Sequence, residues 1–551
     1  MSTSTDITMN GNGSTDHILR PRAIKPGNPQ VLRAQEEESG GKGTNGAADL
    51  AASTVSSGRS TPLPPDAPPS AQHISTARRQ IRHKQRLFPT IDYAARVSHF
   101  DPRSEYADFR GFFTLFWIGL AIMVITTMLR NIKDTGHPMR VRIWALFTID
   151  VWQLGLADLA MVCTTAVSLP LQVLFRSSNG VLRWSKGGMA IQSIYQSVWL
   201  TAWVILPFVL GWTWTAQVFF TLHILAILMK MHSYAFYNGH LSETERRLEE
   251  LDHPATASKA SAYRYPSSGG TMRDTPKGEV VREKEQNGQE TLTSLREDLA
   301  VELTSPLGHV TYPQNLTLSN YVDYVLCPTL CYELEYPRTE RVRWSELMWK
   351  ILAIFGCIFL LTVTSEEYIL PVLTDSSAQL DAVDTLSETG MILAETISQL
   401  LFPFLVTFLL VFLVIFEYVL GALAEITRFA DRQFYHDWWN STDWLEFSRE
   451  WNIPVHHFFR RHVYGASRPH LSRPLATAIT FLISAIAHEL VMVCITKKLR
   501  GYGFVSMMLQ LPLVMIQRTK WIRGNKVLNN VCFWCSIIFG LSMMCALYVL
   551  V

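Results

Sequence analysis

The sequence predicts an all-α protein that crosses a membrane several times. Charged residues make up 17% of its 551 residues, whereas soluble domains average about 25%. The apolar residues gather in segments, most of which reach the roughly 20 residues that a helix needs to span a bilayer. Nine such segments lie near residues 109–130, 147–175, 190–212, 214–235, 346–373, 391–427, 474–496, 501–517 and 529–550. The predicted fold class is therefore a polytopic membrane protein with about nine transmembrane helices.

Net charge and cysteine content argue against several other classes. The 49 Lys and Arg nearly balance the 47 Asp and Glu, so the formal charge of +2 indicates no nucleic-acid partner. Cys532 and Cys535 form a Cys-x-x-Cys pair, but they lie in an apolar segment that lacks polar support for a metal or redox site. We interpret the eight cysteines as packing residues.

Two polar stretches lie outside the apolar segments. Residues 1–88 are rich in Ser, Thr, Gly, Pro and charge, and they predict a disordered cytosolic tail that is not a signal peptide. Residues 240–310 lack sustained apolar periodicity and predict a mobile cytosolic loop. The core of the protein is therefore expected to occupy residues 89–551, with this loop inside it.

Basic residues set the expected orientation. The basic residues that end the tail, from Arg78 to Arg86, place the N-terminus in the cytosol, because positive charge favours that side. Nine crossings then put the uncharged C-terminal end on the opposite side. The fit is imperfect, because Arg130 and Lys497 fall on the side that should be lumenal.

The apolar helix predicted over 475–496 contains His488 and Glu489. His488 lies about 14 residues, or roughly 20 Å, from the start of this helix and therefore near the middle of the bilayer. Ionisable groups at this depth are costly and usually mark a functional site. Desolvation there favours the neutral imidazole that a general base requires. A hydrogen bond between helices is the structural alternative.

Two neighbours of His488 could share its role. Ser484 lies four residues earlier, on the same helical face, and could be a nucleophile that His488 activates. A serine in an apolar helix more often bonds back to the carbonyl four residues before it. Glu489 points about 100° away from His488, which favours pairing with a neighbouring helix.

Polar residues also interrupt an aromatic segment over 434–444. An aromatic belt at the membrane surface would explain its tryptophans, but not Asp437 and Asn440. Asp443 and Glu446 have the spacing of a capping box, which predicts a short helix through residue 451. Asn452 and Pro454 are expected to end this helix, with Ile453 pushed to an extended conformation before the proline.

Residues 455–464 are aromatic and basic, and the orientation argument places them on the cytosolic side. Arg460, Arg461 or Arg468 could contact the phosphates of coenzyme A through charge-assisted hydrogen bonds. The usual excess of positive charge on the cytosolic side explains any one of these arginines equally well.

These segments carry a family resemblance. Phe434-Tyr435-His436-Asp437-Trp438-Trp439-Asn440 resembles the Phe-Tyr-x-Asp-Trp-Trp-Asn motif of the sterol and diacylglycerol branch of the membrane-bound O-acyltransferases. The segment around His488 resembles the one that holds the catalytic histidine of the family. Trp451 to His456 resembles the segment that holds a second polar residue, here Asn452. The resemblance covers about residues 89–551, apart from the 240–310 loop.

The resemblance implies an enzyme that transfers a long-chain acyl group from acyl-CoA to the 3-hydroxyl of a sterol, making sterol esters for storage in lipid droplets. It implies that His488 and Asn452 are catalytic, with acyl-CoA as a co-substrate and without a metal or other cofactor. It also implies a multi-pass protein of the endoplasmic reticulum membrane that forms a homodimer or a dimer of dimers. The residues that it assigns to the motif and to acyl-CoA binding are Phe434, Tyr435, Asp437, Trp438, Trp439, Asn440, Trp451, Arg460, Arg461 and Ser484.

The acceptor is the open question at this stage. Met229 to Tyr234 and Phe109 to Phe113 resemble sterol O-acyltransferases, whereas Pro328 to Leu334 and Trp451 to His456 are close to diacylglycerol acyltransferases. Arg341 to Trp344 and Arg500 to Tyr502 look like the fungal sterol enzymes, and we therefore favour a sterol. Two other classes remain possible, a transporter with His488 as a proton relay and a non-catalytic sterol-binding scaffold.

Overall fold

The computed structural model describes residues 91–101 except 92, 104, 110–138, 149, 151–252, 295–306 except 297, 308–519 and 525–551. All regular elements in this part of the chain are helical. The predicted tail 1–88 lies outside the described residues, as does most of the predicted loop 240–310.

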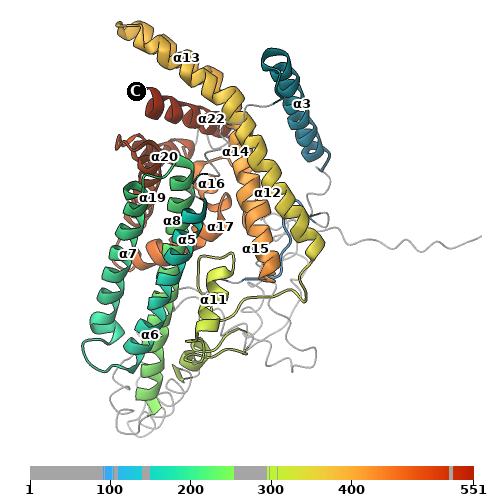
Figure 1. The fold of residues 1–551 in the computed structure, drawn as a ribbon. Helices are drawn as coiled ribbons and strands as arrows, with labels where there is room; N and C mark the ends of the chain where they lie inside the picture. The colour runs from blue at the N-terminus through green and yellow to red at the C-terminus, as the bar shows by residue number, and fades with distance from the viewer. Residues whose placement is uncertain are drawn as a thin grey trace, which may run out of the picture. The chain divides into compact units, whose positions relative to one another are not determined.

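Eight helical units among the described residues are long and apolar enough to cross a membrane (Figure 1). They are α3 (Arg110–Thr135); α5, η2 and α6 (Val151–Thr164, Thr165–Val167, Ser168–Ser177); η3 and α7 (Trp184–Gly188, Met189–Val209); α8 (Trp214–Asp252); α12, η4 and α13 (Trp344–Thr364, Ser365–Ile369, Leu370–Asp381); α14, η5 and α15 (Leu386–Phe412, Leu413–Val419, Leu420–Ile426); α19 (Arg473–Thr496); and α22 (Lys526–Leu550). The remaining predicted segment, 501–517, forms a shorter apolar helix of 16 residues, α20 (Tyr502–Gln517). The all-α, polytopic fold class is confirmed.

Short helices fill the connections between the long ones. They are α11 (Leu318–Leu326), η6 (Trp438–Asn440), α16 (Trp444–Glu450), α17 (Ile453–Phe458), η7 (Phe459–Tyr464) and α18 (Gly465–Ser467). Except for α11, all of them lie between α15 and α19, in the segment where the sequence places most of the candidate site.

The start of the predicted loop is wrong, because α8 continues as a helix to Asp252 instead of ending near residue 240. Ion pairs with neighbouring elements hold this polar extension. Glu245 accepts from Arg176 Nε at 2.8 Å, and Glu243 accepts from Arg183 Nε at 3.0 Å. Apolar periodicity does not detect a helix that is held by charge.

Residues 391–427, predicted as one unusually long helix, form the 41-residue unit of α14, η5 and α15. Pro403 lies inside α14 without ending it, because neighbouring groups can satisfy the backbone that a proline frees. The unit contains the π-helix η5, a type of turn that often occurs at functional sites.

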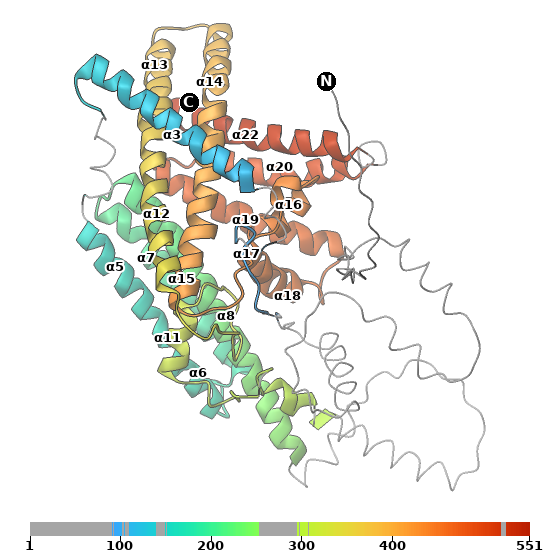
Figure 2. The same ribbon diagram turned by 90° about the vertical axis from the view of Figure 1, so that its right-hand side faces the viewer.

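The long helices run in two directions. Figure 2 shows α19, α20 and α22 lying across the direction of α12 and α14. α19 packs against α20 and α8, and α14 packs against α22. η7 also packs against α19, which brings the segment after Asn452 to the helix that carries His488.

The largest buried cluster is unusually rich in aromatic side chains, and it joins α8, η5 and the 434–438 segment. Its buried aromatic members are Tyr234, Tyr237, Tyr312, Tyr321, Tyr324, Tyr332, Tyr336, Phe412, Phe416, Phe429, Phe434, Tyr435 and Trp438. Tyrosine and tryptophan bury much apolar area and still offer a hydroxyl or N–H group for a hydrogen bond, so the tyrosines let this core hold polar groups in fixed positions.

Candidate active site

His488 lies on α19, which begins with a proline in its first turn and ends at Lys497 in the left-handed conformation. Nδ1–H of His488 donates to the carbonyl oxygen of Ser484 at 2.8 Å. A carbonyl oxygen only accepts, so the hydrogen bond places the proton on Nδ1 of the neutral ring and leaves a lone pair on Nε2. The side chain is exposed, so no described residue covers it. The geometry suits a general base with Nε2 as the accepting atom.

Ser484 contacts His488 through its backbone. The carbonyl oxygen of Ser484, and not its hydroxyl, makes the hydrogen bond to the ring. A serine nucleophile would need its hydroxyl within reach of the imidazole. The observed contact therefore gives Ser484 a role in orienting His488 and provides no support for a covalent acyl-enzyme.

Glu489 is 8% exposed and links three helices. Its carboxylate accepts from the backbone N–H of Gly501 at 2.8 Å and of Phe504 at 3.0 Å. The hydroxyl of Tyr548 on α22 donates to it at 2.8 Å. The prediction that Glu489 pairs with a neighbouring helix is confirmed, because it supplies acceptors for N–H groups at the start of α20.

Asn452 is the N-cap residue of α17, and its Oδ1 accepts from the N–H of Val455 at 3.1 Å. This hydrogen bond fixes the orientation of the side-chain amide, so Nδ2, which only donates, points away from the cap. Asn452 is partly exposed. The arrangement leaves an oriented donor next to the first turn of α17.

The backbone between Asp443 and Pro454 differs in two respects from the prediction. Asp443 is confirmed as the N-cap of α16, since Glu446 N–H donates to its Oδ1 at 2.7 Å, but the Glu446 carboxylate accepts from the N–H of Thr442, one residue before the position that a capping box uses. Ile453, however, begins α17 and is not extended, because Pro454 lies in the first helical turn, where its missing N–H costs nothing. Asn452, with φ −143°, lies between α16 and α17 and caps α17.

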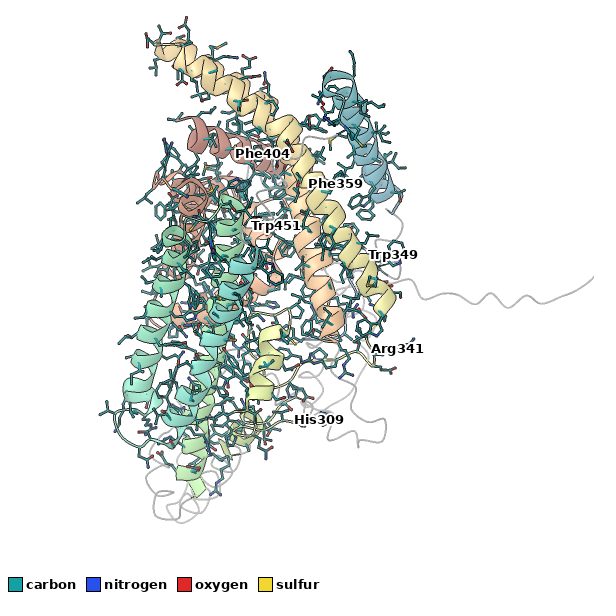
Figure 3. All side chains as sticks on the ribbon, in the orientation of Figure 1. His309, Arg341, Trp349, Phe359, Phe404 and Trp451 are labelled. Carbon is teal, nitrogen blue, oxygen red and sulfur yellow. The ribbon has the colours of Figure 1, made fainter. Side chains whose placement is uncertain are left out.

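Half of the six fixed residues of the 434–440 motif are buried. Phe434, Tyr435 and Trp438 are 3%, 1% and 1% exposed. The Trp438 ring centroid lies 4.8 Å from that of Trp451. Figure 3 shows Trp451 inside the bundle. The expectation that these tryptophans form a belt at the membrane surface does not hold for Trp438, which is a core residue.

The other three motif residues are less buried. Asp437 and Trp439 are partly buried and Asn440 is exposed. Asn440 Nδ2 donates to Asp437 Oδ2 at 3.3 Å. The backbone carbonyl of Trp439 accepts from Trp534 Nε1 of α22 at 3.1 Å. These polar residues shape the turn itself, and its backbone is tied to α22.

The two adjacent arginines of η7 have opposite environments. Arg460 is exposed. Arg461 is 1% exposed, and its Nη1 donates to Glu333 Oε1 at 2.9 Å and to the Tyr332 carbonyl at 3.0 Å. Its guanidinium also lies over the Tyr237 ring, 4.6 Å from the centroid. This placement gives Arg461 a structural role in the core, and its expected role in binding coenzyme A stays a prediction.

Sequence reasoning missed Glu417 and Lys350. Lys350 Nζ on α12 lies 3.0 Å from Glu417 Oε1 in η5, and both side chains are largely buried. The same rule that singles out His488, an ionisable residue within an apolar segment, would have found both residues.

Eight candidate membrane spans among the described residues, one of which carries an oriented imidazole, define the class of polytopic membrane proteins. The model of the membrane-bound O-acyltransferase family matches residues 198–550. This chain belongs to that family.

Two sterol O-acyltransferases resemble this chain over most of its length, and a diacylglycerol enzyme resembles less than half of it. The probable sterol O-acyltransferase 2 of Schizosaccharomyces pombe is 37% identical over 480 residues, which are 86% of this chain and 94% of that protein. The sterol O-acyltransferase 2 of Candida albicans is 32% identical over 501 residues, 84% of this chain and 78% of that protein. The diacylglycerol O-acyltransferase 1 of Dictyostelium discoideum is 37% identical over 244 residues, 44% of this chain and 38% of that protein.

Proposed function

We propose that this protein is a sterol O-acyltransferase, which transfers a long-chain acyl group from acyl-CoA to the 3-hydroxyl of a sterol and makes sterol esters for lipid-droplet storage. One observation carries the choice of acceptor. Sterol O-acyltransferases match 86% and 84% of this chain, whereas the diacylglycerol enzyme matches 44%.

His488 is the proposed general base. A sterol hydroxyl is too weak an acid for imidazole to ionise beforehand, so Nε2 takes the proton as the oxygen attacks the thioester carbonyl. The C–S bond then breaks, the ester is released, and the thiolate of coenzyme A takes the proton from the imidazolium. The hydrogen bond from Nδ1–H to the Ser484 carbonyl supports this role, because it keeps the lone pair on Nε2 and stabilises the charged ring.

Asn452 is the proposed second catalytic residue. Its Nδ2 would orient the sterol hydroxyl or donate to the oxyanion that develops on the thioester carbonyl, and one such donor is typically worth about 3 kcal/mol. Support comes from the N-cap hydrogen bond, which holds the amide in one orientation. For coenzyme A we propose Arg460, whose exposed guanidinium is available to phosphates.

The setting of the reaction follows from its substrates. We propose an endoplasmic reticulum membrane protein with a cytosolic N-terminus, in which 89–551 is the catalytic core and 1–88 a cytosolic tail. The sterol and the acyl chain reach His488 from the bilayer, and coenzyme A stays on the cytosolic side. We also propose a homodimer or dimer of dimers.

The acceptor can be tested directly. Detergent-purified protein is given labelled oleoyl-CoA with ergosterol, cholesterol and diacylglycerol in competition, and the products are separated. Sterol ester is the expected product. Triacylglycerol as the product would support acyl transfer but would mean that the acceptor is diacylglycerol, in agreement with the partial match to the diacylglycerol enzyme. Absence of any ester would contradict the proposed function.

The role of His488 predicts that His488→Ala lowers ester formation at least about 100-fold, because the base that takes the proton is lost. His309→Ala is the matched control, since this histidine is 74% exposed and lies near α11 (Figure 3). A wild-type rate in folded His488→Ala protein would contradict the general-base role of His488.

A further inference from the structure

Glu417 is the carboxylate at the centre of a buried polar group that the proposed mechanism does not use. It lies in η5 within the Leu386–Ile426 span and is 8% exposed. A carboxylate at such a position is costly and usually has a function. The contacts of its two oxygens show what that function is.

Lys350 on α12 neutralises this carboxylate. Its Nζ donates to Glu417 Oε1 at 3.0 Å and to the Glu417 backbone carbonyl at 3.1 Å. The second bond satisfies a carbonyl in the π-helix, where the regular hydrogen-bond pattern is altered. Gly421 leaves room for the lysine, because a Cβ there would lie 2.8 Å from Nζ. The ion pair is therefore built into the packing of α12 on η5 and α15.

The other oxygen, Oε2, accepts two hydroxyl hydrogen bonds. Tyr435 of the motif donates to it at 3.1 Å, and Ser98 of the segment before α3 also donates to it. The two hydroxyl oxygens lie 3.2 Å apart. Tyr435 is 1% exposed, so its hydroxyl acts on the protein and not on a substrate.

A short path leads from Tyr435 to Asn452. The backbone carbonyl of Phe434, the residue before Tyr435, accepts from the N–H of Ile453 at 3.0 Å. Ile453 follows Asn452 and begins α17. A second contact holds the same two segments together, since His436 N–H donates to the Glu450 carbonyl at 2.8 Å. A shift of Tyr435 therefore moves the backbone that carries Asn452.

We propose that Glu417, held by Lys350, is a positioning residue that fixes the motif through the Tyr435 hydroxyl and thereby places Asn452 for the reaction. This inference rests on the proposed function, in which Asn452 acts on the substrates. Displacing a catalytic group by about 1 Å can cost about 100-fold in rate. Glu417 therefore affects turnover without contacting a substrate.

Steady-state kinetics of Glu417→Gln test the effect on turnover. The amide turns an NH₂ group toward either Lys350 or the two hydroxyls, so we expect kcat to fall about 10- to 100-fold with little change in KM for acyl-CoA. Glu367→Gln is the matched control. Glu367 also lies in a π-helix and is joined to α3, where Asn131 donates to it at 2.8 Å and Arg130 Nη2 lies 3.6 Å away. We expect that variant to keep the wild-type kcat.

A double-mutant cycle separates positioning from general loss of stability. If Glu417 acts through Tyr435, then Tyr435→Phe lowers kcat by a similar factor, and the double variant Glu417→Gln/Tyr435→Phe is no worse than the poorer single variant. Independent, multiplying effects would overturn the proposal. So would a wild-type kcat in folded Glu417→Gln protein.

Hydrogen exchange of the full-length protein in detergent gives a measurement that does not depend on activity. We expect the peptide that contains the Ile453 amide to exchange faster in Glu417→Gln than in wild type or Glu367→Gln, because the Phe434 carbonyl loses its fixed position. Unchanged exchange would overturn the positioning role, whatever the acceptor proves to be. If Glu417→Gln exchanges faster but the wild-type protein makes no ester, the result contradicts the proposed function and leaves the positioning role intact.

Discussion

At the scale of single residues, local contacts assign chemical roles. The hydrogen bond between His488 and the Ser484 carbonyl lies within one helix, and it selects the tautomer in which Nε2 is the base. Asn452 is similar, because a cap bond to Val455 orients its amide. Both contacts join residues three or four positions apart in the sequence.

The histidines of α17 predict a pH dependence of stability. Burial, followed by nearby positive charge, lowers the pKa of His456 to about 4 and that of His457 to about 3. In the unfolded chain a histidine has a pKa of about 6.5. Between these values the unfolded state binds more protons, so these two residues make the fold less stable as the pH falls below about 6.5.

Glu450 acts in the opposite direction. Burial and the charges of Glu446 and Asp437 raise its pKa to about 7, so between about pH 4.5 and 7 the folded state binds the extra proton. We expect the histidines to dominate, with the melting temperature of the purified protein falling from pH 7 to pH 5. Glu450→Gln should steepen this fall and His457→Asn should reduce it. A melting temperature that rises toward pH 5 would contradict this balance.

At the scale of elements, η7 separates two neighbouring arginines into different environments. Successive residues of a helix point in different directions, so Arg460 faces outward while Arg461 reaches Glu333 in the aromatic core. Their neighbouring positions in the sequence suggested one shared role in binding phosphates, and the packing of the element separates them.

The two arginines therefore predict different defects. Arg460→Ala should leave the protein folded and raise KM for acyl-CoA by about tenfold, because a charge-assisted contact is lost. Arg461→Ala should lower the free energy of unfolding by about 3–5 kcal/mol, since Glu333 is left buried without its partner. Steady-state kinetics and thermal unfolding of both variants check this. Equal effects of both substitutions on KM would restore Arg461 to the binding site.

At the scale of the whole molecule, α19 is held in place by hydrogen bonds between its Glu489 and two other helices. Glu489 receives hydrogen bonds from the start of α20 and from Tyr548 of α22. α19 also packs on α8 and η7. The helix that carries His488 is thus located by contacts with elements far apart in the sequence.

Loss of this carboxylate should destabilise the bundle. Glu489→Ala leaves two backbone N–H groups and the Tyr548 hydroxyl without their acceptor, and each buried unsatisfied group costs about 1–3 kcal/mol. We expect a lower melting temperature in detergent. Glu395→Ala, at an exposed position of α14, is the control and should change it little. Equal melting temperatures for both variants would mean that the bonds of Glu489 contribute no stability.

The fold class, the long helices and the candidate site residues were predictable from the sequence alone. Apolar segments of spanning length, an imidazole inside one of them and the 434–440 motif are properties of neighbouring residues, and periodicity and local chemistry detect them. The N-cap of α16 was predicted for the same reason. The end of α8 was not predicted, because the ion pairs that hold it involve Arg176 and Arg183, which lie far from it in the sequence.

Only the tertiary structure decided which polar groups are buried and with what partners. The sequence places Arg461 near Arg460, and 128 residues separate Arg461 from Glu333. Glu417 and Lys350 are 67 residues apart. These partners meet because α12, η5 and the motif pack around one aromatic core, and in that core an unpaired charge would be too costly to keep.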